Sequence, residues 1–119
     1  MIHVNELRIG NWVEKFTDLG DSLGYSPISP KEFLAIHTNP ERVNPVPLTE
    51  EILLKCGFVR RGITSNNGGK LTLHHKDNMY PNGRVYWNSW CILDSIPEHL
   101  HQLQNLYFAL TGEELEINL

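Results

Sequence analysis

The hydrophobic and polar positions of the chain predict their clearest element near its end, a helix from Ser95 to Gly112. At the helical repeat, one face is an apolar stripe of Leu100, Leu103, Leu106, Tyr107 and Leu110. The other side is polar and carries His101, Gln102, Gln104 and Asn105. Ser95 and Glu98 have the spacing of a capping box, and Gly112 can take the positive φ that ends a helix. We therefore predict an amphipathic helix whose stripe packs on the core and whose polar side faces water.

Phe108 is the exception on this helix, because the repeat points it toward the polar side, near His101. It either packs against a second layer of the same protein or contacts a partner. Isolated surface aromatics are ordinary, which favours the first alternative. For the second alternative, a contact with a partner, Phe108 and His101 are the candidate interaction surface on this helix.

Start signals mark two shorter helices. Ser29 and Glu32 repeat the capping-box spacing ahead of apolar residues, and Thr49 followed by two glutamates is typical of a helix start that Gly57 would close. The proline-rich residues 39–47 between them predict an extended connector, since residues before proline avoid helical backbone angles.

The remaining segments have strand patterns. Residues 4–16 predict a strand with a bend or bulge at Gly10, of the kind that opens small SH3-like barrels. Residues 17–28 predict mostly loop, with a short strand around residues 25–28 as the alternative. Residues 59–76 predict a hairpin whose turn reads NNGG, because Asn-Gly supplies the positive φ values of a tight turn. Residues 81–83, reading PNG, predict a second turn into two further strands. We expect an α+β protein in which an antiparallel meander is packed by the C-terminal helix.

Length and composition are those of one folded domain. The 119 residues are 40% hydrophobic and 20% charged, with a net charge of −4. We predict a single domain over residues 1–119 and leave open a subdivision into 1–44 and 45–119. The opening residues have no signal-peptide pattern and no apolar run is long enough to span a membrane, so we expect a cytoplasmic protein. Cys56 and Cys91 lack paired spacing and have apolar neighbours, which predicts two buried, reduced thiols, with a disulfide between them as the alternative.

Three segments carry a family resemblance: residues 5–13, 45–58 and 99–117, reading NELRIGNWV, PVPLTEEILLKCGF and HLHQLQNLYFALTGEELEI. They resemble a family of small proteins of unknown function carried by bacteriophages, prophages and other mobile elements of gut anaerobes. The resemblance implies a single-domain α+β protein of mobile-element origin. It implies no catalytic residue, cofactor or substrate. The Gly- and Ser-rich residues 18–29 depart from the barrel strands of that family.

Charge is unevenly distributed along the chain. Residues 55–84 contain six basic residues and one acidic residue, a net charge of +5, whereas the remainder carries −9. Cations beside aromatic rings are what phosphates and unstacked bases require. The candidate ligand-binding residues for nucleic acid or a nucleotide are Arg60, Arg61, Lys70, His74, Lys76 and Trp87. The alternative is a solvated sheet face over core tryptophans, which the acidic character of the whole chain favours.

No recognised catalytic or metal motif is present in the sequence. His74 and His75 point to opposite faces of a strand, and His99 and His101 diverge on a helix, so neither pair chelates alone. Zinc and metalloprotease spacings, a nucleophile elbow and a phosphate-binding loop are absent. We expect no cofactor, no metal and no enzymatic activity.

Two hypotheses of different class follow. The leading one is a non-catalytic accessory protein of a phage or mobile element that binds a host or phage protein. The alternative is a nucleic-acid- or nucleotide-binding module that uses residues 55–84. The sequence also leaves room for a homodimer through Phe108 or the sheet edges.

Overall fold

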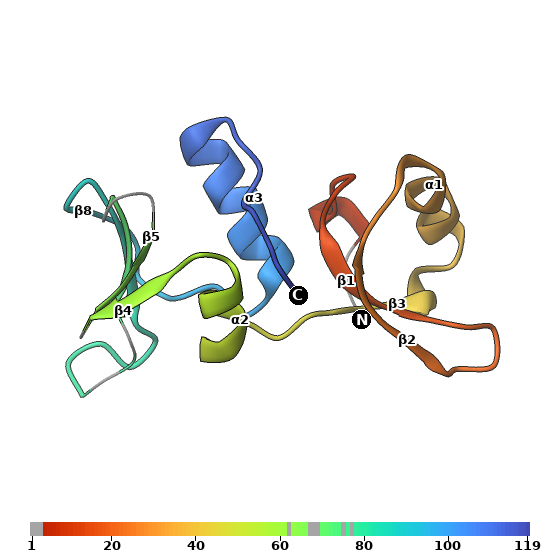
Figure 1. Cartoon of the computed structure of the whole chain (residues 1–119), viewed down its shortest axis with the longest axis horizontal. Helices are drawn as coiled ribbons and strands as arrows, with labels where there is room; N and C mark the ends of the chain where they lie inside the picture. Colours follow the sequence, from red (N-terminus) through yellow and green to blue (C-terminus); the bar gives the residue numbers. More distant parts are fainter. Residues whose placement is uncertain (1–3, 62, 67–69, 75, 77) are drawn as a thin grey trace. The chain divides into compact units, whose positions relative to one another are not determined.

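The structure, a computed structural model, describes residues 4–61, 63–66, 70–74, 76 and 78–119 (Figure 1). The chain forms two compact units. The first unit consists of Met1–Leu48 and Glu98–Leu115, and the second consists of Thr49–Pro97 and Glu116–Leu119. Both units combine helix with antiparallel strands, so the predicted α+β class is confirmed.

The first unit is built on a three-stranded antiparallel sheet of order β2-β1-β3. Its elements are the 3-10 turn η1 (Val4–Glu6), β1 (Trp12–Phe16), β2 (Ser22–Pro27), α1 (Pro30–Thr38), the 3-10 turn η2 (Pro40–Arg42), β3 (Val43–Pro45) and α3 (Leu100–Thr111). Its core cluster is made of Leu7, Val13, Ile28, Ile36 and Val43, with Phe33 packed against it. The core therefore draws on the opening segment, the sheet and α1.

The N-terminal strands differ from the expectation. The first strand begins only at Trp12, after Gly10 with its φ of +94°. Residues 22–27 form β2, which begins earlier than the short strand left open at residues 25–28 and replaces most of the expected loop. Two backbone hydrogen bonds explain the change, because Gly10 N donates to Ile28 O at 2.8 Å and Ile28 N donates to Asn11 O at 2.9 Å. Both bonds lie just beyond the ends of β1 and β2 and hold these ends together. They join residues 17 or 18 positions apart in the sequence, so the hydrophobic pattern of either segment alone does not predict them.

The two short helices begin as predicted. The Ser29 hydroxyl accepts from Glu32 N, and the Glu32 carboxylate accepts from Ser29 N, which completes the capping box of α1. Thr49 Oγ1 accepts from Ile52 N at the start of α2 (Glu50–Lys55), and Gly57 follows it with a φ of +83°. Both starts were readable because a cap depends on residues within one turn of each other.

The start of α3 was predicted wrongly. The helix begins at Leu100 with His99 as its N-cap residue, whereas a capping box at Ser95 and Glu98 had been expected. The backbone just ahead of α3 is extended instead, because it pairs with residues 46–48. Leu48 N donates to Glu98 O at 2.9 Å and Leu100 N donates to Val46 O at 2.9 Å. The end was predicted correctly, with Gly112 at a φ of +74°.

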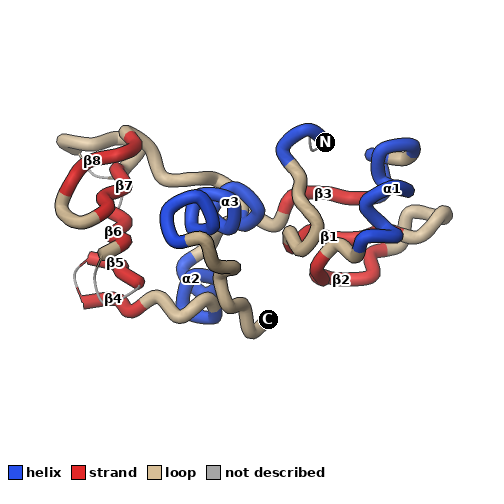
Figure 2. Tube along the Cα trace, turned by 90° about the horizontal axis from the view of Figure 1, so that it is seen from above, coloured by secondary structure: helices blue, strands red, loops and turns tan. Residues whose placement is uncertain are grey.

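The second unit contains α2 and a five-stranded antiparallel sheet of order β4-β5-β6-β7-β8, which confirms the predicted meander (Figure 2). Its strands are β4 (Val59–Arg61), β5 (Ile63–Asn66), β6 (Leu71–His74), β7 (Arg84–Trp87) and β8 (Trp90–Leu93). The first expected strand is divided into β4 and β5, which pair with each other. The turn predicted at residues 66–69 lies largely outside the described residues.

Candidate functional site

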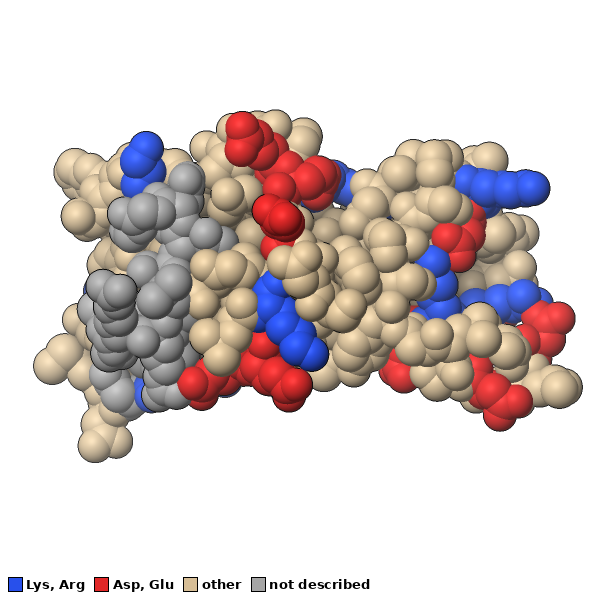
Figure 3. All heavy atoms as spheres, in the orientation of Figure 1, with Lys and Arg blue, Asp and Glu red and all other residues tan. Residues whose placement is uncertain are grey.

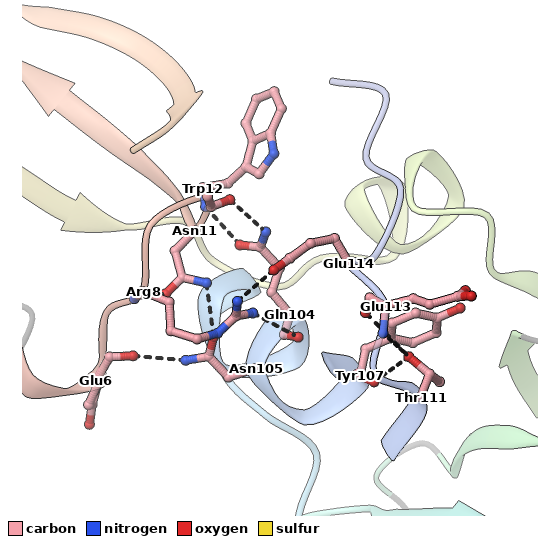
Figure 4. A network of polar contacts seen from close by, with 11 residues as sticks. Glu6, Arg8, Asn11, Trp12, Gln104, Asn105, Tyr107, Thr111, Glu113 and Glu114 are labelled. Carbon is pink, nitrogen blue, oxygen red and sulfur yellow. Dashed lines mark hydrogen bonds and ion pairs between the residues drawn. The ribbon is translucent and has the colours of Figure 1, made fainter. Parts of the chain in front are cut away.

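The polar side of α3 is not a solvent face. Gln104 is buried, its Oε1 accepts from Trp12 N at 2.7 Å, and its Nε2 donates to Gly10 O at 3.1 Å (Figure 4). Asn105 accepts from Asn11 Nδ2 at 2.9 Å and donates to the carbonyl oxygen of Glu6 at 2.8 Å. These bonds saturate polar groups of the opening segment that would otherwise be buried unpaired. The network therefore fixes the opening segment on α3, which gives the polar residues a structural role.

His101 is 1% exposed, so the expectation that it belongs to an interaction surface is wrong. Its Nε2 lies 3.2 Å from Glu6 Oε2, while Nδ1 is buried with no hydrogen-bond partner among the residues that the structure describes. Burial lowers the pKa of His101 below its ordinary value, Glu6 opposes that shift, and His99 adds to it. His99 stacks on His101 with ring centroids 5.8 Å apart. Within the described part of the chain, no three His, Cys, Asp or Glu residues are placed to hold a metal ion.

Phe108, the other half of that predicted surface, is partly covered by the same protein. It is 41% exposed, and the Arg8 guanidinium carbon lies 4.6 Å from the centroid of its ring. Arg8 is held in place by Asn105 and Glu114, each at 2.6 Å (Figure 4). The cation therefore occupies much of the surface that a partner of Phe108 would need.

The strand β6, which carries His74, alternates between buried and half-buried side chains. Leu71 and Leu73 are fully buried, whereas Thr72 and His74, which alternate with them along the strand, are half-buried. Lys70 and Lys76, which flank β6, are exposed. Arg60 and Arg61 belong to β4, opposite Thr64 and Ile63, and their side chains lie outside the described part of the structure.

Trp87 does not join this group. It pairs with Leu71, whereas Thr72 pairs with Tyr86 and His74 pairs with Arg84. Since side chains alternate across a strand, Trp87 belongs to the face of Leu71 and Val85, opposite the face of His74. The structure therefore places Trp87 on the opposite face of the sheet from His74.

The aromatic residues beside His74 are Tyr80 and Tyr86, which sequence reasoning did not select. The Arg84 guanidinium carbon lies 4.0 Å from the centroid of the Tyr80 ring, and the His74 ring meets Tyr80 edge-on at 5.3 Å. A hydrogen bond to Tyr86 raises the pKa of Arg84 above its ordinary value. Asp94 Oδ1 lies 3.9 Å from Arg84 Nε, so the carboxylate offsets part of the positive charge of Arg84. Arg84 and Tyr86 are two residues apart on the expected strand, so the sequence could have shown that they share one face. The pairing of His74 with Arg84 places that face beside His74.

The other exposed feature of the second unit is its edge strand, β8. All four of its residues are exposed, with Trp90 at 77% and Leu93 at 39%, although Trp-Cys-Ile-Leu carries no charge. Among the described strands, β8 pairs only with β7, through a two-residue turn whose residues Asn88 and Ser89 have φ of 50° and 71°. Its outer edge is thus an apolar strand that pairs with no other described strand.

The two cysteines are free thiols in contrasting environments. Cys91, in the middle of β8, is exposed, so the prediction that both thiols are buried is wrong for this residue; its Sγ lies 3.5 Å from Leu93 O. Cys56 is buried, and burial raises the pKa of its thiol to about 11. Native-state thiol chemistry is therefore expected at Cys91, which makes this residue a probe of the edge.

The first unit contains two adjacent hollows that share Phe16 and Arg42. One of about 200 Å³ lies beside α1, and its polar groups include Lys15, which is paired with Glu32 at 2.8 Å. The other, of about 310 Å³, is lined by Asp18, with which Arg42 forms an ion pair. Acidic and basic side chains are interspersed over this part of the face in Figure 3. The cations Lys15 and Arg42 of these hollows are thus already paired with carboxylates of the same protein.

Comparison of the chain with protein-family models, with curated proteins and with solved structures finds no match. Among the described residues, no helix is both long and apolar enough to cross a membrane. Of the candidate sites, β8 has the most distinctive geometry, because its four uncharged residues are all exposed at a sheet edge. Sequence reasoning predicted the strand but could not show that its outer edge is uncovered.

Proposed function

We propose that the chain is a non-catalytic accessory protein of a phage or mobile element that binds a host or phage protein through the β8 edge. The supporting observation is the exposure of Trp90, Cys91, Ile92 and Leu93 along an unpaired sheet edge. A strand edge offers a row of backbone N–H and C=O groups, so an extended partner segment can add to the sheet as a further strand.

The chemistry of β8 favours this mode over others. Backbone pairing supplies affinity that is independent of sequence, while a large exposed aromatic such as Trp90 supplies an anchor of the kind that dominates protein interfaces. Such an edge needs no catalytic group or cofactor. The resemblance of residues 5–13, 45–58 and 99–117 to mobile-element proteins supports the part of the proposal that concerns a phage or mobile-element origin.

The exposed thiol of Cys91 allows a site-specific test. A maleimide-benzophenone attached to Cys91 under native conditions should photocross-link the partner when the labelled protein is placed in host lysate. The matched control is Cys91→Ser combined with Leu34→Cys, which moves the thiol to an exposed position on α1. We expect a discrete adduct from Cys91 and none from position 34, with the adduct identified by mass spectrometry. Equal adducts from both positions, or none from Cys91, would contradict the proposal.

A second candidate function is favoured by the cluster of Arg84, Tyr80 and His74 beside the exposed Lys70 and Lys76. Such a face suits phosphate groups and unstacked bases. We expect a single-stranded oligonucleotide to bind weakly and to dissociate between about 50 and about 200 mM salt. Lys70→Glu with Lys76→Glu should abolish that binding, whereas Lys31→Glu, on α1, should not. Binding that persists unchanged in the double variant would exclude this face.

A further inference from the structure

The two hollows of the first unit differ in chemistry. The hollow of about 200 Å³ lies between α1 and the sheet, exposes mainly apolar surface, and reaches Ile36 and Val43 of the core cluster. The hollow of about 310 Å³ exposes mainly polar surface of the β1–β2 turn and of η2. Phe16 and Arg42 line both hollows, so an apolar space adjoins a charged one. A small molecule with an apolar end and a charged end is the kind of ligand that fits both.

A β-bulge places Leu23 beside the apolar hollow. In the β1–β2 pair, Lys15 lies opposite Gly24 and Phe16 lies opposite Ser22, so Leu23 has no partner in this register. Bulges re-aim side chains and are over-represented beside functional sites. Leu23 is 65% exposed although it lines the hollow. A ligand in the hollow would therefore cover apolar surface of Leu23 that the fold leaves in water.

The polar hollow carries charges of both signs. Asp18, Glu41 and Arg42 line it, and Arg42 forms an ion pair with Asp18. The side chains of Arg42 and Asp18 are 47% and 73% exposed, and an ion pair as exposed as this one contributes little to stability. Opening the pair for a ligand therefore costs little.

The same charges select a ligand that bears both signs. A simple anion would meet the carboxylates of Asp18 and Glu41, and a simple cation would meet Arg42. A zwitterion pairs with both, because its carboxylate can accept two parallel hydrogen bonds from the Arg42 guanidinium while its ammonium group donates to the carboxylates.

We propose that the first unit binds a free α-amino acid with an apolar side chain. The side chain occupies the apolar hollow, and the carboxylate and ammonium groups lie between Arg42 and Asp18. A free amino acid carries both charges on one carbon, whereas either end of a peptide carries only one of them. The volumes of the hollows suit a ligand at the small end of the range for small-molecule sites, roughly 300–1,000 Å³. This site is independent of the β8 edge and of the basic face, which belong to the second unit.

Calorimetric titration of the whole chain tests the ligand class, with L-leucine as the probe. Because leucine has few non-hydrogen atoms, we expect saturable binding with a Kd of about 0.1–1 mM. Three analogues each lack one feature: isocaproic acid lacks the ammonium group, isoamylamine lacks the carboxylate, and glycine lacks the apolar side chain. Each should bind about tenfold or more weakly than leucine.

Variants with matched controls test the location. Arg42→Gln should weaken leucine binding about fivefold or more, and in Asp18→Asn leucine should lose its advantage over isocaproic acid. Asp21→Asn removes a charge from the same turn but lines neither hollow, so it should change the affinity less than about twofold. Leu23→Ser should weaken binding, whereas Leu34→Ser, at a similarly exposed leucine outside the hollows, should not. Circular dichroism and thermal unfolding would show that each variant is folded.

Three outcomes would overturn the proposal. The first is that none of leucine, isoleucine, methionine and phenylalanine saturates the protein by about 20 mM. The second is that isocaproic acid binds as tightly as leucine, which would assign the hollows to apolar carboxylic acids. The third is a leucine affinity that neither Arg42→Gln nor Leu23→Ser changes, which would place the binding elsewhere.

Discussion

At the scale of single residues, Gly83 shows how a turn is fixed by space as well as by backbone angle. Its φ is +71°, and a Cβ there would lie 2.6 Å from His74 O and 2.7 Å from Ile96 Cδ1. Gly20 has a similar φ of +87° but nothing within 4 Å of the same position. A side chain at position 20 would therefore add only the cost of the backbone angle, whereas one at position 83 would add the cost of crowding as well.

We predict that Gly20→Ala destabilises the protein by about 1 kcal/mol, the cost of a left-handed non-glycine residue. Gly83→Ala should cost about 2 kcal/mol more, because the backbone at His74 must also move. Urea unfolding of both variants measures the difference. Equal losses would show that the contact with His74 O and Ile96 relaxes freely.

His101 is predicted to make stability depend on pH. Burial lowers the pKa of His101, so the unfolded chain binds a proton near pH 6.5 that the folded protein binds only at lower pH. The free energy of unfolding should therefore fall as pH falls below about 6.5. In His101→Gln the unfolding free energy should vary less between about pH 7.5 and 5. An unchanged slope in His101→Gln would contradict the prediction.

At the scale of elements, the starts of α1 and α2 were readable from sequence and the start of α3 was not. A capping box is complete within four residues, so Ser29 and Glu32 determine the start of α1 wherever that helix lies. Ser95 and Glu98 have the same spacing, but the residues around them are held in extended pairing by residues 46–48. A distant strand therefore displaced a local signal.

Ser29→Ala is predicted to destabilise the first unit by about 1 kcal/mol, because Glu32 N loses its acceptor. Lys31→Ala, an exposed substitution in the same turn, should change stability by less than about 0.5 kcal/mol. Chemical denaturation followed by circular dichroism measures both. A comparable loss in the two variants would mean that the cap contributes little.

At the scale of the whole molecule, the second unit is inserted into the first between Leu48 and Glu98. These two residues are already neighbours, since Leu48 N donates to Glu98 O at 2.9 Å. The segments that contain them run antiparallel, as the pairing of Pro47 with His99 shows. The first unit is therefore built from two stretches of chain whose ends meet.

Replacement of residues 49–97 by Asn-Gly is predicted to leave a folded first unit, because that dipeptide closes an antiparallel pair as a tight hairpin. Dispersed amide signals and a cooperative unfolding transition would be the expected outcome. Val13→Asp in the same shortened chain should remove both, since Val13 is fully buried in the core of that unit. A shortened chain without a cooperative transition would show that the first unit requires the second.

The sequence by itself determined the elements whose signals are local: the caps of α1 and α2, the end of α3 at Gly112, the turn at Gly83 and the alternation of β6. These depend on backbone angles and bonds within a few residues, which residue type alone specifies. Tertiary structure alone decided the burial of His101 and Gln104, the separation of Trp87 from His74, and the uncovered edge at Trp90. Each of these depends on what lies opposite a residue in space, and the polar side of α3 was buried because distant backbone groups needed its hydrogen bonds.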